Sequence, residues 1–197
     1  MTNYRFRSIK QRLRALFSFA GSGFVLLVSG VLLILIAAYA WDRGLLADFD
    51  ASVLPPKVGI NTQYDCRLLW IDDGDSIHVR CDQEQWRVRL LGIDAPEMGQ
   101  APWGARSKDV LTELLSDELT LRTHGLDVYQ RVLATVYVGE QDINLLMITR
   151  GAAVAYRGDD TPDAYYSAER IAKAQKLGIW GQPGEQQDPK RWRRYHL

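Results

Sequence analysis

Three short segments of the chain carry side chains that suit the chemistry of phosphodiester cleavage. They are Asp73-Gly74-Asp75-Ser76, the run from Arg89 to Glu97, and the run from Asp127 to Arg131. Carboxylates hold hard divalent metals, and a further carboxylate can orient an attacking water. Arginine grips phosphate through its planar fork of donors. Together the segments contain the groups that metal-assisted attack of water on a phosphodiester requires.

Each segment alone has a simpler structural explanation. Asp and Gly are preferred turn residues, so Asp73-Gly74-Asp75 by itself indicates only a hairpin. The segment Asp94-Ala95-Pro96-Glu97 is more specific, because a proline at a strand end stops the hydrogen-bond ladder and leaves two carboxylates there. The sequence has no Cys or His cluster at metal spacing and no glycine-rich phosphate loop. Zinc and P-loop mechanisms are therefore not predicted.

In combination and spacing, the three segments resemble the staphylococcal nuclease (thermonuclease-like) family over about Asp65 to Trp180. The resemblance implies a five-stranded oligonucleotide/oligosaccharide-binding barrel with helices packed on it. It also implies a Ca²⁺-dependent nuclease that cleaves DNA and RNA with little sequence preference, by water attack that leaves 3′-phosphate ends. The implied partners are DNA and RNA as substrates, and no protein partner is predicted.

The resemblance assigns three residues to the metal. Asp75 and Asp94 correspond to the carboxylate ligands of calcium, and the backbone carbonyl of Ala95 corresponds to a further oxygen ligand. Asp73 matches a neighbouring acidic position of the family, although a turn residue explains it better. Ala95 replaces a hydroxyl residue that is frequent in the family, and this change leaves the carbonyl in place.

Five further residues are assigned to the reaction and the substrate. Glu97 corresponds to the carboxylate that orients or deprotonates the attacking water. Arg89 and Arg131 correspond to the two phosphate-binding arginines. Tyr129 and Tyr156 resemble the aromatic lining of the nucleotide pocket, and ordinary packing is an equally good interpretation of either ring.

Two departures from the family pattern concern substrate binding. Val128 stands where a basic residue is frequent, which removes one substrate contact. Gln130 stands where a glycine is common before the phosphate-binding arginine, and this restricts the turn. Neither change removes a group that the chemistry requires.

The distribution of charge bears on two alternative functions. Five of the 24 basic residues and none of the 24 acidic residues lie in residues 1–41, so the remainder carries 19 basic and 24 acidic side chains, net −5. Nucleic-acid binding must therefore rest on local clusters rather than on an overall basic field. One alternative is a membrane-anchored nucleic-acid-binding module of the same fold that does not cut. The other is a structural protein of the cell envelope, which the net negative charge mildly favours.

Residues 21–41 are predicted to form a transmembrane helix. No charge occurs in residues 15–41, and the almost wholly apolar residues 24–40 are long enough to cross a hydrocarbon core of roughly 30 Å. Because the basic residues precede this segment, the N-terminus is expected in the cytoplasm and the rest of the chain outside, in the periplasm or at the cell surface. The alternative is a cleaved signal peptide and a secreted protein, since Ala38-Tyr39-Ala40 fits the cleavage pattern.

The predicted fold is α+β, namely a five-stranded OB-fold-like β-barrel with three packed α-helices, preceded by one transmembrane helix. The family resemblance implies the barrel, whereas hydrophobic periodicity alone indicates a strand-rich first half and a helical second half of the domain. The expected strands are Cys66–Ile71, Ser76–Cys81, Trp86–Ile93, Leu119–Thr123 and Val132–Val138. The expected helices are Ala105–Leu115, one capped by Asp142 that runs through Arg150, and one begun by Thr161-Pro162-Asp163 that ends at Gly178.

The predicted organisation has five parts. Residues 1–20 form a basic cytoplasmic N-terminus and residues 21–41 the membrane segment. Residues 42–63 form a tether, residues 64–181 a nuclease-like domain and residues 182–197 a basic C-terminal tail. A solvated tail is the favoured interpretation of this last segment, and contact with nucleic acid or anionic lipid is the alternative.

The two cysteines lie symmetrically about Asp73-Gly74. If these residues close a two-residue hairpin, Cys66 faces Cys81, and a cross-strand disulfide can form in an oxidising compartment. A pair of small buried thiols is an equally good interpretation.

Overall fold

The computed structural model describes Tyr39 and residues 56–196, and residues 54–197 form one compact unit. The predicted N-terminal segment, the predicted transmembrane helix apart from Tyr39, and most of the predicted tether lie outside the described residues. Within the described part of the chain, no helix is long and apolar enough to span a bilayer.

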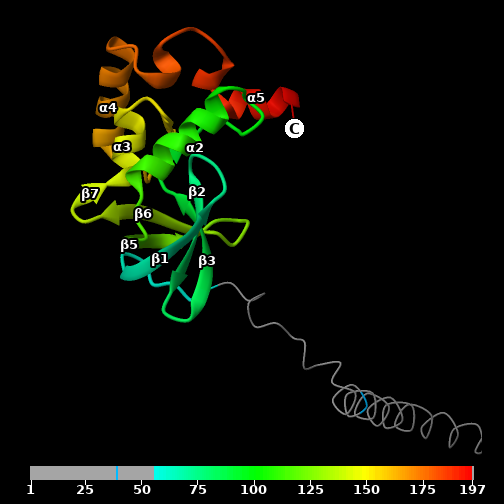
Figure 1. The fold of residues 1–197 in the computed structure, drawn as a ribbon, viewed down its shortest axis with the longest axis vertical. Helices are drawn as coiled ribbons and strands as arrows, with labels where there is room; N and C mark the ends of the chain where they lie inside the picture. The colour runs from blue at the N-terminus through cyan, green and yellow to red at the C-terminus, as the bar shows by residue number, and fades with distance from the viewer. Residues whose placement is uncertain (1–38, 40–55, 197) are drawn as a thin grey trace, which may run out of the picture. The chain divides into compact units, whose positions relative to one another are not determined.

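Five strands form a closed barrel (Figure 1). They are β1 (Gln63–Ile71), β2 (Ser76–Cys81), β3 (Glu84–Leu90), β5 (Glu118–Leu126) and β6 (Val132–Val138). Neighbours pair antiparallel in the order β3-β2-β1-β5-β6, and a parallel pairing of β3 with β6 closes the ring. The predicted five-stranded barrel is confirmed.

Three two-residue strands complete the sheets. β7 (Gln141–Asp142) extends the barrel sheet beside β6, whereas β4 (Ile93–Asp94) pairs with β8 (Val154–Ala155) in a separate ladder. β4 follows β3 after Gly92, whose φ of 77° is readily adopted by glycine. This kink carries Asp94 out of the barrel wall, close to Arg89 at the end of β3.

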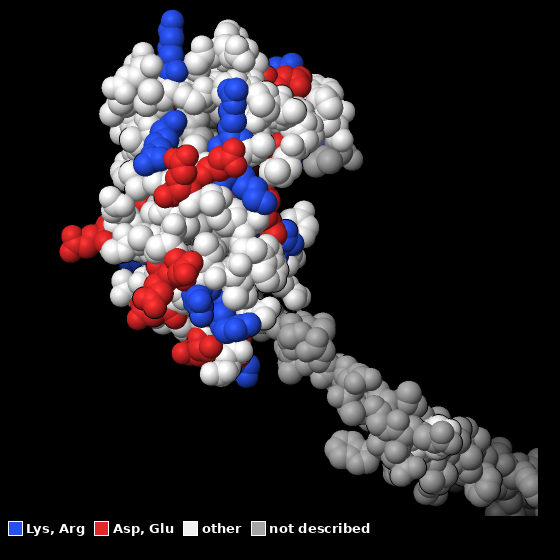
Figure 2. Space-filling view, in the orientation of Figure 1, with Lys and Arg blue, Asp and Glu red and all other residues white. Residues whose placement is uncertain are grey.

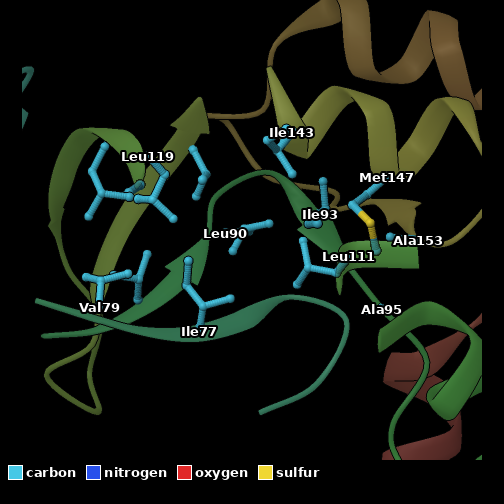
Figure 3. Close-up of a cluster of buried hydrophobic side chains, with 14 of the residues drawn as sticks. Ile77, Val79, Leu90, Ile93, Ala95, Leu111, Leu119, Ile143, Met147 and Ala153 are labelled. Carbon is cyan, nitrogen blue, oxygen red and sulfur yellow. The ribbon is translucent and has the colours of Figure 1, made fainter. Parts of the chain in front are cut away.

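The barrel core follows the alternation of the strands. Ile77 and Val79 of β2, and Val88 and Leu90 of β3, are all at most 1% exposed. Figure 3 shows Ile77, Val79 and Leu90 within the cluster of buried side chains. Arg89 lies between two of these core residues and faces the other side of its strand, because side chains alternate along a strand. The alternation that builds the core therefore also directs this arginine out of it.

Four helices follow or interrupt the strands. They are α2 (Trp103–Leu114), α3 (Ile143–Thr149), α4 (Asp163–Ala174) and α5 (Pro189–His196), with 3-10 turns η2 (Gly178–Trp180) and η3 (Glu185–Gln187). The first three correspond to the predicted helices, and α3 packs against both α2 and α4 at one end of the barrel (Figure 1).

The predicted N-terminal cap of α3 is right, and the predicted ends of α4 are wrong. The Asp142 carboxylate accepts the backbone N–H of Leu145, so the predicted cap of α3 is confirmed. The predicted start of α4 is wrong by one residue, because the extended Pro162 is itself the cap position and makes no side-chain cap. The predicted end at Gly178 is also too late, since α4 ends at Ala174 and Lys176 turns the chain with a φ of 56°.

The expected solvated tail is instead built into the domain. It forms η3 and α5, with Pro189 and Gln186 buried. The Trp192 ring lies against Gly99, where an added Cβ would come within 2.8 Å of the ring. A short helix made mainly of basic and aromatic residues has no apolar stripe, so the periodicity of the sequence did not reveal it.

The hairpin of β1 and β2 pairs the cysteines but has a longer loop than predicted. Cys66 lies opposite Cys81, and the two form a disulfide. A register shift between Leu68 and Trp70 then adds one residue to β1, and residues 72–75 form the loop. The predicted register is thus right at the cysteines and wrong at the turn.

Candidate active site

Two buried carboxylates come together where the 72–75 loop meets β4. Asp75 is 7% exposed and Asp94 is 3% exposed. The N–H of Ala95 donates to Asp75 Oδ2 at 2.7 Å, which ties the loop to β4. Asp73 Oδ1 accepts the N–H of Asp75 at 3.0 Å, so Asp73 has the turn role that its residue type indicated. The structure therefore brings together the two residues that the sequence assigned to a metal.

Gly74 allows this loop to pack directly on α2. A Cβ at this position would collide with the Ser107 hydroxyl and would lie 2.8 Å from the Ala95 Cβ. The glycine between the two aspartates is thus required by close approach as well as by the turn.

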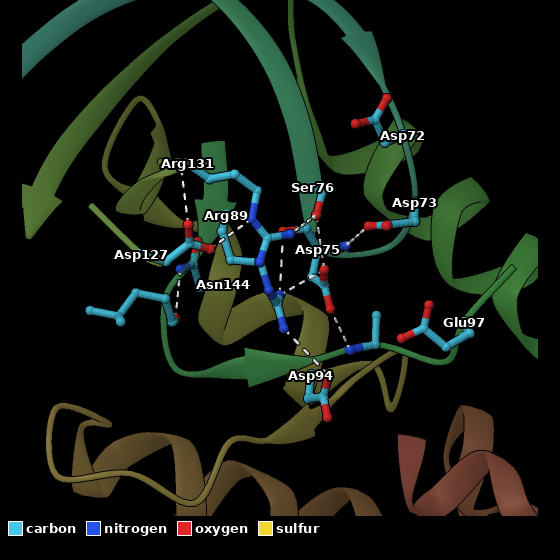
Figure 4. A network of polar contacts seen from close by, with 12 residues as sticks. Asp72, Asp73, Asp75, Ser76, Arg89, Asp94, Glu97, Asp127, Arg131 and Asn144 are labelled. Carbon is cyan, nitrogen blue, oxygen red and sulfur yellow. Dashed lines mark hydrogen bonds and ion pairs between the residues drawn. The ribbon is translucent and has the colours of Figure 1, made fainter. Parts of the chain in front are cut away.

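Arg89 bridges the two carboxylates (Figure 4). Its Nη1 lies 2.7 Å from Asp75 Oδ1 and its Nη2 lies 3.3 Å from Asp94 Oδ1. The side chain is only 15% exposed, so these charges interact away from bulk water. The predicted phosphate-binding arginine therefore also holds the acidic pair in place.

Arg131 is oriented by Asp127, to which the sequence analysis assigned no separate role. Asp127 Oδ2 accepts Arg131 Nε–H at 2.7 Å, and Oδ1 accepts the backbone N–H groups of Arg131 and Tyr129 at 2.9 and 2.8 Å. Burial raises the pKa of Asp127, but these hydrogen bonds and the Arg131 charge outweigh it and hold the pKa below its usual value. Gln130 occupies the left-handed region at a φ of 63°. Glycine, which is common at this position in the family that the sequence resembles, adopts this conformation more readily.

Glu97 lies in the turn that follows β4. Its backbone N–H donates to Gln100 Oε1 at 2.6 Å, and Gln100 Nε2 in turn donates to the Glu185 carbonyl at 3.1 Å. The Glu97 carboxylate is 30% exposed and accepts a hydrogen bond from Arg193 Nη1 at 2.6 Å. Gln100 thus fixes the turn that carries Glu97, the predicted water-orienting residue. Gln100 is a buried polar residue that belongs to none of the motifs in the sequence.

Arg193 of α5 is the principal site residue that sequence reasoning missed. Its Nη1 and Nη2 lie 3.1 and 3.0 Å from the two Asp94 carboxylate oxygens. Burial lowers the pKa of Arg193, but the hydrogen bonds to Asp94 and Glu97 and their charges outweigh it and raise the pKa above its usual value. No local spacing connects residue 193 with residue 94, and the basic run around Arg193 was interpreted as a tail.

Asn144 stabilises the backbone that leads from Arg89 to Asp94. This buried residue accepts the Val136 N–H at 3.0 Å and donates to the carbonyls of Leu91 and Ala134 at 2.9 and 3.0 Å. It thereby fixes the chain between Arg89 and Asp94 against β6. A polar residue at the start of an apolar helix is the only sequence signal that it gives.

The acidic pair is incompletely neutralised. The pKa of Asp75 is raised to about 7, chiefly by burial; Arg89 opposes this rise, and the nearby Asp73 and Asp94 add to it. A cation placed beside Asp75 would favour its ionised form. Across residues 56–196, no group of three or more His, Cys, Asp or Glu side chains forms a ready-made metal cluster. The oxygen donors available to a hard cation are the Asp75 and Asp94 carboxylates and the Ala95 carbonyl, a donor set that fits calcium and excludes soft metals.

A pocket of about 710 Å³ joins these groups, and it is lined by the three carboxylates, the arginines 89, 131 and 193, and both predicted tyrosines. Tyr129 is 76% exposed and Tyr156 is 44% exposed, so neither ring is part of the core. The Arg131 guanidinium lies 5.5 Å from the centre of the Tyr129 ring. Figure 2 shows acidic and basic side chains intermixed on the face in view, in line with a site that depends on local charges.

Comparison with known proteins assigns the chain to a family. Residues 87–182 match the family model described as staphylococcal nuclease homologue. A micrococcal nuclease of Shigella flexneri is 34% identical over 179 residues, which cover 85% of this chain and 90% of that protein. The chain belongs to the staphylococcal nuclease family. This confirms the family resemblance drawn from the motifs.

Other family relatives differ in how far they extend along the chain. An uncharacterized endonuclease of Haemophilus influenzae is 38% identical over 131 residues, 66% of this chain and 72% of that protein. Protein ParB of Escherichia coli is 34% identical over 141 residues, 63% of this chain and 76% of that protein. The matched family model includes Arg89, Asp94, Glu97 and Arg131, whereas Arg193 lies beyond its last residue.

Proposed function

We propose that this family member is a Ca²⁺-dependent nuclease that cleaves DNA and RNA with little sequence preference and leaves 3′-phosphate ends. The observation that carries the proposal is the convergence of two buried carboxylates, a partly buried carboxylate and two arginines on one pocket. Support also comes from the relatives in Shigella flexneri and Haemophilus influenzae, which are named a nuclease and an endonuclease.

The metal site is proposed at Asp75, Asp94 and the Ala95 carbonyl. Calcium bound there would neutralise phosphate charge and strengthen the electrophilic character of phosphorus. The Ala95 N–H and Arg89 hold the Asp75 carboxylate beside Asp94, so the two acidic residues are positioned before a ligand arrives. Such preorganisation lowers the cost of assembling the site.

Glu97 is proposed to orient the attacking water and to accept its proton. A general base needs an acceptor oxygen within hydrogen-bond reach of the water, and the Glu97 carboxylate faces the pocket beside Asp94. The hydrogen bond from its backbone to Gln100 limits the movement of this turn.

Arg89 and Arg131 are proposed to bind the phosphoryl oxygens as charge develops on them. Asp127 binds Nε of Arg131, which directs the rest of the guanidinium to the pocket. Donors that are already oriented stabilise a developing charge without reorganisation at the moment of reaction. The exposed rings of Tyr129 and Tyr156 are proposed to stack with or cover the adjacent bases.

We also propose that residues 21–41 anchor the protein in a membrane, with the N-terminus in the cytoplasm and the nuclease domain outside. The uncharged stretch before Asp42 and the Cys66–Cys81 disulfide support this arrangement, because disulfides persist in oxidising compartments. N-terminal sequencing of the mature protein tests it. An intact N-terminus supports the anchor, and a terminus near Trp41 would indicate a cleaved signal and a secreted enzyme.

The nuclease activity is tested with the full chain, purified in detergent, on single-stranded DNA and on RNA, with calcium or with a chelator. We expect both substrates to be cut only with calcium, and we expect 3′ product ends that cannot be ligated to a 5′-phosphorylated adaptor until a phosphatase removes the 3′-phosphate. A folded protein that binds the oligonucleotides but cuts neither would instead be a non-catalytic binding module.

A further inference from the structure

Arg193 binds the same oxygens that the proposed metal and water require. Its guanidinium contacts both oxygens of Asp94, at 3.1 and 3.0 Å, and one oxygen of Glu97, at 2.6 Å. The Asp94 side chain is 5% exposed, and the Arg193 side chain is 33% exposed. One cationic group from the C-terminal helix therefore contacts two of the three site carboxylates.

Packing and hydrogen bonds of the neighbouring residues fix the position of Arg193. Trp192 packs against Gly99 in the turn that follows Glu97, and Gln100 joins the same turn to the Glu185 carbonyl of η3. Pro189 is buried at the start of α5. The other basic residues of this helix, Lys190, Arg191 and Arg194, are exposed. Only Arg193 among them is directed into the pocket.

We propose that Arg193 is an internal competitor of the metal, so that calcium binding at Asp94 and docking of α5 on the active site oppose each other. The inference rests on the proposed function, because it takes Asp94 as a metal ligand. Its physical basis is competition for the same oxygens and repulsion between two cations. A guanidinium that donates to both oxygens of a carboxylate leaves neither free for bidentate coordination, and two cations a few ångströms apart repel each other in a site of low dielectric.

The competition has a reciprocal consequence. If α5 weakens calcium binding by some factor, calcium weakens the docking of α5 by the same factor. The C-terminal helix thus covers Asp94 and Glu97 when calcium is scarce. A rise in calcium frees Arg193 from the carboxylates and opens the pocket. Arg193 lies beyond residues 87–182, which match the family model.

Calcium titration calorimetry without substrate tests the competition directly. The full chain is compared with Arg193→Gln and with Arg194→Gln, a matched control that removes the same charge from an exposed position of the same helix. We expect Arg193→Gln to lower the calcium Kd by about tenfold, within the range usual for coupled sites, and Arg194→Gln to change it by less than about twofold. Arg193→Lys keeps the charge but lacks the planar fork, so its Kd should lie between the two.

Hydrogen exchange of the wild-type chain provides a test that needs no variant. Saturating calcium should speed exchange of the amides of Arg193 to His196 by at least about fivefold, the lower end of typical coupling, while the β2 amides stay unchanged. Calcium that leaves the α5 amides unchanged or slows their exchange would overturn the proposal. An Arg193→Gln chain that binds calcium no more tightly than Arg194→Gln would overturn it as well.

These outcomes separate the competition from the nuclease function. A wild-type chain that cuts DNA in calcium, together with unchanged affinity in Arg193→Gln, refutes the competition alone. Tighter calcium binding in Arg193→Gln by a chain that cuts no nucleic acid refutes the nuclease function alone. Absence of calcium binding in all the variants refutes the competition, since no metal is then present for Arg193 to oppose.

Discussion

The Asp127 carboxylate holds Arg131 at three points of one turn, through the arginine Nε and through the backbone N–H groups of Arg131 and Tyr129. Because one carboxylate fixes both the guanidinium and the turn that carries it, the position of the proposed phosphate ligand depends on Asp127. Replacing Asp127 by Asn removes the charge and retains most of the shape.

We expect Asp127→Asn to lower kcat/KM for DNA cleavage by about ten- to a hundredfold, since hydrogen bonds between charged groups contribute about 1.5–3 kcal/mol. Steady-state kinetics on a defined oligonucleotide measure the effect. Asp109→Asn, at an exposed position on α2, is the matched control and should cut at the wild-type rate. Equal activity of both variants would show that Arg131 does not need this partner.

Arg131→Lys should reduce kcat by about a hundred- to a thousandfold, although it preserves the charge. Lysine is a point charge and cannot bind Asp127 and two phosphoryl oxygens through one planar group, and a single preorganised donor contributes about 3–4 kcal/mol to the transition state. Arg80→Lys, at an exposed position on β2, is the control. Single-turnover rates distinguish the outcomes, and a rate near that of wild type would rule out a bidentate role for Arg131.

Gly74→Ala should destabilise the domain by about 1–3 kcal/mol, the usual cost of overpacking. The added methyl group would meet the Ser107 hydroxyl and the Ala95 Cβ, so the loop that carries Asp75 would have to move away from α2. Urea unfolding followed by tryptophan fluorescence gives the change in the free energy of unfolding. Wild-type stability in this variant would contradict the close packing of the loop.

Glu169 of α4 should make stability depend on acid pH. This buried carboxylate accepts hydrogen bonds from Arg157 and Lys173 and from the Ala155 N–H of β8. Burial raises the pKa of Glu169, but the hydrogen bonds and the Lys173 charge outweigh it, and the pKa is lowered below 4.5. A lowered pKa in the folded state contributes stability above the unfolded-state pKa, and this stability is lost as the pH falls through the folded-state value.

The measurement is the free energy of unfolding of Glu169→Gln at a series of pH values. We expect this variant to be less stable than wild type at pH 7 by about 1.5–3 kcal/mol, the contribution of hydrogen bonds to a charged group. The difference should shrink as the pH falls below about 4.5, where the carboxylate of the unfolded chain becomes protonated. Glu140→Gln, at an exposed turn, should follow wild type. A pH-independent difference would show that the charge of Glu169 is not what stabilises this region.

The strands, the helices and one helix cap could be predicted from the sequence because local physics determines them, whereas the barrel and the paired carboxylates were predicted from the family resemblance. Alternation places Val88 and Leu90 inside and Arg89 outside, and the Asp142 side chain caps its helix in the expected way. The register of the hairpin turn could not be predicted, because the shift between Leu68 and Trp70 has no residue signature.

The site contacts that escaped prediction join residues far apart in the sequence. Arg193 meets Asp94 across 99 positions, and Asn144 meets the Leu91 carbonyl across 53. Such contacts follow from how the helices pack on the barrel, and no periodicity or motif in one sequence encodes them. For this reason, the prediction that residues 182–197 form a solvated tail was wrong.

Metal-assisted cleavage with Glu97 as the base is tested by the rate at which the full chain cleaves single-stranded DNA in calcium, compared with Glu97→Gln and the control Glu140→Gln. We predict that wild type and Glu140→Gln cut in calcium and stop in chelator, and that Glu97→Gln is slower by at least about a hundredfold, as for loss of a general base. Cleavage that continues in chelator, or at the full rate in Glu97→Gln, would contradict the account.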